Sequence, residues 1–178
     1  MNSRPNRRLP TVSRRRLLTI GPIAGCAMSL GFLARAASDA QRLVLKNLQT
    51  HEELEVELYR DRGLLPSAMA QIEALLRDAV TGERHSIDPD LIDDLFTLAS
   101  VLGASPVFHV ISAYRAHQSE AARPSLHALG RAIDLRLVGV DCADLASAAR
   151  KLERGGVGYY RRSDFVHLDT GACRSWRG

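Results

Sequence analysis

Two histidines and one aspartate in the last third of the chain have residue types and spacing suited to a metal site. His127 lies seven residues before Asp134, and His167 follows in the short apolar segment from Phe165 to Asp169. Two imidazole nitrogens and one carboxylate oxygen are a donor set that suits Zn²⁺. Three protein ligands leave a fourth position for water, so the pattern predicts a catalytic rather than a structural zinc ion.

The strands expected around these residues favour a common face. In residues 132–137 the apolar side chains alternate, which places Asp134 on the face opposite Ile133 and Leu135. In residues 165–169 Val166 and Leu168 take the core in the same way, and His167 faces away from it. If the two strands are neighbours, Asp134 and His167 lie on one face. His127, just before a turn expected at Gly130, then folds back over it.

Three more polar residues belong to the predicted site. Asp164, three residues before His167, is expected to act as the general base for the metal-bound water; the alternative is an ordinary aspartate in a turn. Arg115 is expected to pair with a substrate carboxylate or with the oxyanion, unless it forms a structural ion pair. Asp169 is expected to hold a ligand histidine rather than to bind the metal.

These motifs resemble a known family. The sequence Ser-x-His-x-x-Gly-x-Ala-x-Asp from Ser125 to Asp134, followed by Asp164 and His167, is similar to the zinc D-Ala-D-Ala peptidase superfamily of hedgehog-like fold. Within it the chain most resembles the exported M15-type murein endopeptidase K group. Further similar segments are Thr81-Gly82-Glu83, Ile87-Asp88-Pro89, Val110 to Arg115 and Gly155 to Tyr160.

The resemblance implies cleavage of peptidoglycan peptides, with zinc bound by His127, Asp134 and His167. It also implies Asp164 as acid or base and Arg115 as the cation beside the substrate. Eleven residues separate Arg115 from His127, fewer than is usual in the group. A shorter segment leaves one side of the cleft open, which favours an endopeptidase. The alternatives are a D,D-carboxypeptidase and a peptidoglycan-binding module without turnover.

Hydrophobic periodicity predicts a single α+β domain over residues 37–178, with a small, mainly antiparallel sheet flanked by helices. The expected strands cover residues 42–48, 54–59, 107–112, 132–137 and 165–169. One helix is expected from Pro66 to near Gly82, and a second from Asp88 to Gly103. A third is expected to begin near Asp141 and Asp144 and to end before Gly155.

Residues 1–36 have the composition of a twin-arginine-type signal peptide. Three consecutive arginines, 14–16, precede Leu17-Leu18, an apolar stretch follows, and Ala34-Arg35-Ala36 fits a cleavage site. We therefore expect export through the Tat translocation machinery to the periplasm or cell envelope, with no membrane span in the mature form. The alternatives are an uncleaved anchor and a lipoprotein lipidated at Cys26.

The charge of the chain is divided between leader and body. Of 24 basic residues, seven arginines lie in residues 1–36 with no acid, which leaves 17 basic against 20 acidic residues in the rest. A body of net negative charge does not attract phosphate, so nucleic acid is not an expected partner. Cys142 and Cys173 are too few for a thiolate zinc site, and whether they pair is left open.

Overall fold

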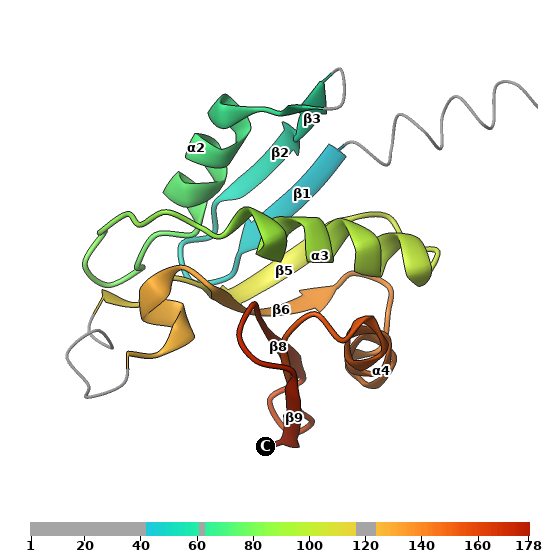
Figure 1. Cartoon of the computed structure of the whole chain (residues 1–178). Coiled ribbons are helices and arrows are strands. Elements are labelled where there is room, and N and C mark those ends of the chain that lie inside the picture. The colour runs from blue at the N-terminus through green and yellow to red at the C-terminus, as the bar shows by residue number, and fades with distance from the viewer. Residues whose placement is uncertain (1–41, 61–62, 117–123) are drawn as a thin grey trace, which may run out of the picture.

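A computed structural model of the chain describes residues 42–60, 63–116 and 124–178 (Figure 1). The leader predicted for residues 1–36 lies outside the described residues. The strands are β1 (Arg42–Asn47), β2 (Glu53–Glu57), β3 (Tyr59–Arg60), β4 (Gly63–Leu64), β5 (Val107–Ser112), β6 (Ala132–Leu137), β7 (Gly156–Tyr160), β8 (Phe165–Asp169) and β9 (Arg174–Arg177). The helices are α2 (Pro66–Leu75), α3 (Pro89–Val101), the short 3₁₀ helix η2 (Leu126–Leu129) and α4 (Cys142–Leu152).

Within the described residues, the main sheet has seven strands in the order β2-β1-β5-β6-β8-β7-β9. The predicted α+β class is confirmed, but the sheet is mixed rather than mainly antiparallel, because β1 pairs with β5 and β7 pairs with β9 in parallel. Consecutive strands joined by a tight turn pair antiparallel, as β7 and β8 do. Between β1 and β5 the chain passes through α2 and α3, and this long connection lets it return in the same direction.

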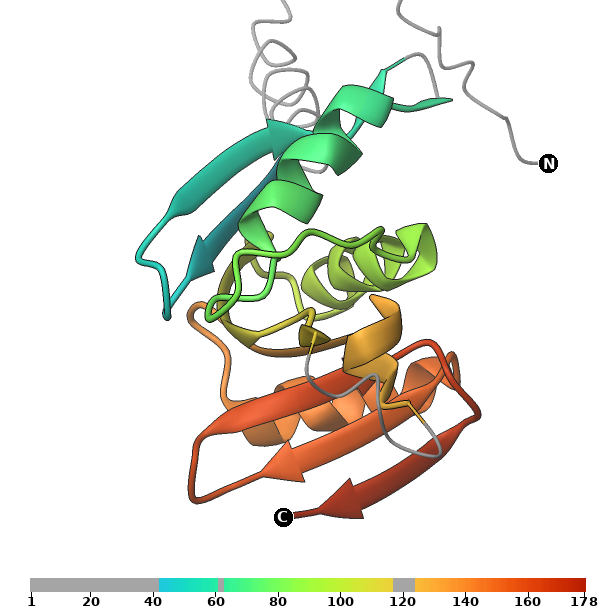
Figure 2. The ribbon, with the colours of Figure 1, turned by 90° about the vertical axis from the view of Figure 1, so that its left-hand side faces the viewer.

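The hydrophobic core lies on one face of this sheet. Register aligns Leu45 with Phe108, Phe108 with Leu137, and Val110 with Leu135, so these alternate residues share a face. Their side chains are buried together with apolar residues of α2, α3 and α4. Figure 2 shows β8, β7 and β9 side by side at one end of the molecule, with the β1–β2 hairpin at the other. The opposite face of β6 and β8 is therefore available for polar residues.

The boundaries of two predicted helices agree with the structure, and one does not. Asp88 caps α3 by accepting a hydrogen bond from the Asp90 amide at 3.1 Å, and Pro89 occupies the first turn as expected. α2 ends at Leu75 instead of near Gly82. The Asp78 carboxylate accepts hydrogen bonds from the Val80 and Thr81 amides, and these bonds form a turn in place of further helix.

Neither cysteine of the body is in a disulfide. Cys142 is buried at the start of α4 and Cys173 is exposed before β9. The question that the sequence left open is thus answered in favour of two free thiols. Among the described residues, every helix is too short or too polar to cross a lipid bilayer.

Candidate metal centre

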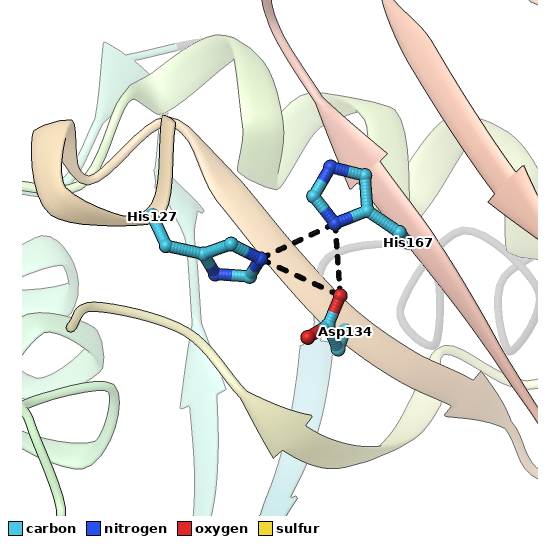
Figure 3. A group of neighbouring side chains, drawn as sticks. All are labelled: His127, Asp134 and His167. Atoms are coloured by element: carbon cyan, nitrogen blue, oxygen red, sulfur yellow. Dashed lines mark hydrogen bonds and ion pairs between the residues drawn. The ribbon is translucent and has the colours of Figure 1, made fainter. Parts of the chain in front are cut away.

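His127, Asp134 and His167 come from three different elements and point toward one another (Figure 3). His127 lies in η2, Asp134 in β6 and His167 in β8, where Asp134 and His167 are directly paired across the two strands. His167 Nδ1 lies 2.9 Å from Asp134 Oδ1 and 3.2 Å from His127 Nε2. The predicted shared face of β6 and β8 is confirmed, and His127 folds back over it.

A tight turn at Gly130 lets His127 reach this face. Ser125 caps η2 by accepting a hydrogen bond from the His127 amide, and Gly130 then adopts a left-handed φ of 66°. A Cβ atom at Gly130 would lie 2.0 Å from the Ser86 carbonyl oxygen. Asp88 also donates its amide to the Gly130 carbonyl at 3.0 Å. The glycine of the motif is thus required both by the backbone conformation and by the neighbouring segment before α3.

In each of the two imidazoles, the ring nitrogen that points away from the other ligand atoms already has a hydrogen-bond partner. His127 Nδ1 lies 2.6 Å from the Ala113 carbonyl oxygen, which only accepts, so Nδ1 carries the proton and Nε2 has the free lone pair. His167 Nε2 lies 3.0 Å from a carboxylate oxygen of Asp169. When both rings are neutral and their protons are on these outer nitrogens, the atoms that face one another are two imidazole lone pairs and Asp134 Oδ1.

This donor set fits a divalent cation. One ligand atom from each of the three buried residues lies within 4.8 Å of the other two. Three acceptor atoms converging in a buried place repel one another unless a proton or a cation lies between them. Two histidines and one carboxylate leave open coordination positions, which is the ligand arrangement of catalytic rather than structural zinc sites. Residues 127, 134 and 167 therefore fit Zn²⁺.

The electrostatics of the group follow from its burial and its hydrogen bonds. Burial opposes ionisation of Asp134, but the imidazoles of His127 and His167, when protonated toward it, outweigh burial and lower the pKa of its carboxyl group. Burial disfavours the charged form of His167, whereas its bonds to Asp134 and Asp169 raise the pKa of the imidazole. Asp134 is thus ionised at neutral pH, as a metal ligand must be.

Arg115 lies beside the ligand group, which consists of His127, Asp134 and His167. Its Nε atom donates to the Ser112 hydroxyl at 2.7 Å, and its Nη2 atom donates to Asp134 Oδ2. About a third of the arginine side chain is exposed, so part of the guanidinium faces solvent next to the buried carboxylate. Arg115 is thereby placed both to orient Asp134 and to meet a negatively charged group arriving from solvent.

Asp164 belongs to a different set of contacts. Its side chain is 67% exposed in the turn between β7 and β8, with Oδ2 3.5 Å from Arg136 Nε, and it also interacts with the Cys142 thiol. Its assignment as general base stays a prediction.

Sequence reasoning missed Arg174 and Trp176 of β9. Arg174 forms an ion pair with Asp169, and the Trp176 ring lies 5.2 Å from the His167 ring, centre to centre. The alternation of Arg174 and Trp176 within Arg-Ser-Trp-Arg places both on one face of a strand, but four residues are too few for that pattern to be read on its own.

Comparisons with known proteins identify the family of the chain. The family model described as peptidoglycan L,D-endopeptidase MepK matches residues 35–176. The chain belongs to this family. The peptidoglycan L,D-endopeptidase MepK of Escherichia coli strain K12 is 36% identical over 176 residues, which cover 92% of this chain and 97% of that protein. The chain is therefore a member of the M15 peptidases, as its motifs indicated.

A second relative has a similar degree of identity. The probable peptidoglycan L,D-endopeptidase MepK of Haemophilus influenzae is 34% identical over 179 residues, covering 93% of this chain and 96% of that protein. No solved structure matched the chain. The hedgehog-like fold implied by the motifs therefore stays an expectation, whereas membership of the MepK family rests on nearly the whole chain.

Proposed function

We propose that this chain is a zinc-dependent murein endopeptidase that hydrolyses an internal peptide bond of peptidoglycan. The observation that carries the proposal is the convergence of His127 Nε2, Asp134 Oδ1 and His167 Nδ1 in a member of the MepK family. The L,D specificity in the names of the relatives supports a bond between an L- and a D-configured centre as the one that is cut.

The three ligand residues would hold the ion, which supplies Lewis acidity for activating water and polarising the scissile carbonyl. Arg115 keeps Asp134 oriented and offers its exposed donors to a substrate carboxylate or to the oxyanion that forms during hydrolysis. Wall peptides near a cross-link carry carboxylates, so a guanidinium beside the scissile bond both binds and orients them. In this scheme Asp164 takes up or returns a proton as acid or base.

The site of action follows from the leader. The arginine-rich segment of residues 1–36 and its apolar continuation support export by the Tat translocation machinery to the periplasm or cell envelope. Peptidoglycan is the partner met there. Cleavage near Ala36 would release a mature domain that starts close to residue 37.

The experiment that tests the proposal supplies purified muropeptides to the zinc-loaded protein. Cross-linked dimers containing L,D or D,D bonds and monomers with a free D-Ala-D-Ala end are incubated separately, and the products are identified by mass spectrometry. We expect monomers from the L,D-linked dimers and intact pentapeptide monomers. Release of D-Ala from monomers with intact dimers would instead show a D,D-carboxypeptidase. Binding of dimers without any product would show a peptidoglycan-binding module.

A further inference from the structure

His167 has a second set of contacts on the side of its ring away from the metal centre. Its Nδ1 atom faces Asp134, and its Nε2 atom lies 3.0 Å from Asp169 Oδ2. A neutral imidazole carries one proton, and the nitrogen without it is the one that can bind a metal ion. Whatever fixes the proton on Nε2 therefore decides whether Nδ1 is available as a ligand.

Both oxygens of the Asp169 carboxylate accept hydrogen bonds from neighbouring groups. Its side chain is completely buried. Oδ1 accepts from the amides of Gly156 and Gly171, at 3.1 and 2.9 Å, and from Arg174 Nη1 at 3.0 Å. Oδ2 accepts from Arg174 Nη2 at 2.7 Å as well as from His167. An ionised carboxylate only accepts, so it favours a proton on the nitrogen that faces it, and in a neutral ring Asp169 at Nε2 competes with Asp134 at Nδ1 for the single proton.

The guanidinium that completes this arrangement comes from the C-terminal strand. Arg174 opens β9 directly opposite Gly156 in the parallel β7–β9 pair. A Cβ atom at Gly156 would lie 2.3 Å from Asp169 Oδ2 and 2.6 Å from Arg174 Nη1, so the ion pair occupies the space of a missing side chain. The Arg174 guanidinium also lies over the Trp176 ring at 5.1 Å, and that ring is beside His167.

We propose that Asp169, held by Arg174, is the positioning residue of His167. It keeps the proton on Nε2, fixes the direction of the ring, and leaves the Nδ1 lone pair directed at the metal position. The proposal rests on the proposed function because it takes His167 to be a metal ligand. It extends that function to β9, which contributes no ligand of its own, since Arg174 acts only through Asp169.

The decisive variant is Asp169→Asn. Two backbone amides and Arg174 Nη1 donate to Oδ1, so the oxygen of the introduced amide stays at that place; its NH₂ group then faces His167 Nε2 and loses the bond from Arg174 Nη2. Nε2 must then accept, which moves the proton to Nδ1. The readout is the ¹⁵N NMR spectrum of the imidazole in metal-free protein, at a pH high enough for a neutral ring. We expect protonated Nε2 in the parent and protonated Nδ1 in the variant.

Zinc affinity is the second readout, measured by competition with a chelating dye. Outer partners of metal ligands typically change affinity by about 10- to 100-fold, and we expect a loss of that size for Asp169→Asn. Arg174→Leu should keep the parent tautomer, because Asp169 still accepts, but should lower affinity by about 10-fold as the carboxylate loosens. Arg174→Lys should restore part of this loss. The control is Arg177→Leu, an exposed position of the same strand, with parent affinity expected.

The outcomes separate this proposal from the proposed function. Protonated Nδ1 in the parent, or an unchanged tautomer in a folded Asp169→Asn protein, would overturn the positioning role even if zinc binds. Should Asp169→Asn fail to fold, the role is overturned if Arg174→Leu binds zinc as tightly as Arg177→Leu. The expected tautomers in a protein that cleaves no muropeptide would support the positioning of His167 and refute the endopeptidase.

Discussion

Arg115 joins the ligand group to the solvent, and its geometry depends on a planar, forked donor. It donates to Ser112 and Asp134 from different nitrogens, which a lysine ammonium cannot reproduce while also facing a substrate. We expect Arg115→Lys to lower the rate of dimer cleavage by about 10²-fold, the usual cost of losing a donor to a developing oxyanion. The rate is measured by chromatography of the muropeptides.

The matched control for this change is Arg42→Lys. Arg42 is an exposed residue of β1 whose ion pair with Glu55 is remote from the metal centre, so its replacement should leave the rate unchanged. Equal rates for Arg115→Lys and Arg42→Lys would show that Arg115 only supports the fold.

Asp164 is predicted to be the general base. If its carboxylate serves as the base, Asp164→Asn should lower hydrolysis by about 10²- to 10⁴-fold, because an amide does not take up the proton. Zinc content should stay at the parent level, since Asp164 is outside the group of ligand atoms. Asp144→Asn, an exposed change in α4, is the control. Parent-level activity in Asp164→Asn would show that Asp164 is not the base and has only a structural role, through its contacts with Arg136 and Cys142.

The convergence of His127, Asp134 and His167 was predictable from the sequence because strand parity is a local property. Alternation alone set Asp134 and His167 on the polar face, and the glycine turn explained the return of His127. The position of Asp164 was not predictable in this way. It adopts a positive φ of 52° in a turn whose path depends on Arg136, a residue of another strand. Contacts between distant segments are not contained in a local pattern.

The segment before α3 packs against the end of η2, and the two are in contact at Gly130. Gly130→Ala should lower the free energy of unfolding by more than about 2 kcal/mol, because it adds a clash with the Ser86 carbonyl to the cost of a left-handed residue. The measurement is urea unfolding of metal-free protein.

Gly139 provides the control for Gly130. It also has a positive φ, 82°, but a Cβ atom there meets nothing within 4 Å, so Gly139→Ala should cost only the conformational part, about 1 kcal/mol. Similar losses in the two variants would mean that the Ser86 contact yields easily and does not hold η2 in place.

Elements were predictable to different degrees for physical reasons. α3 has a capping aspartate, a proline in its first turn and a glycine after its end, and its bounds agree with the expected ones. β7 and β9 were not expected, because Gly156 and Gly158 weaken a strand pattern and β9 has only four residues. The parallel pairing of β1 with β5 joins segments about 60 residues apart. It depends on packing in the core and not on local propensity.

The packing of the whole domain gives the two thiols of the body different reactivity. Burial, with a hydrogen bond to Asp164, raises the pKa of Cys142 to about 11, so little thiolate is present at neutral pH. Cys173 is exposed. Iodoacetamide at neutral pH should therefore label Cys173 in the native protein and Cys142 only after unfolding, as peptide mass spectrometry would show. Equal labelling of both in the native state would mean that the α4 end of the core opens readily.

One buried group of three side chains, His127, Asp134 and His167, is proposed to hold a zinc ion on the polar face of the sheet. Zinc content per chain, measured by plasma mass spectrometry after metal-replete expression and dialysis, tests it directly. The parent should contain about one zinc ion per chain, and the His127→Ala His167→Ala double variant should contain almost none, because a single carboxylate does not retain the ion. A parent without zinc, or a double variant that keeps the full content, would contradict the claim.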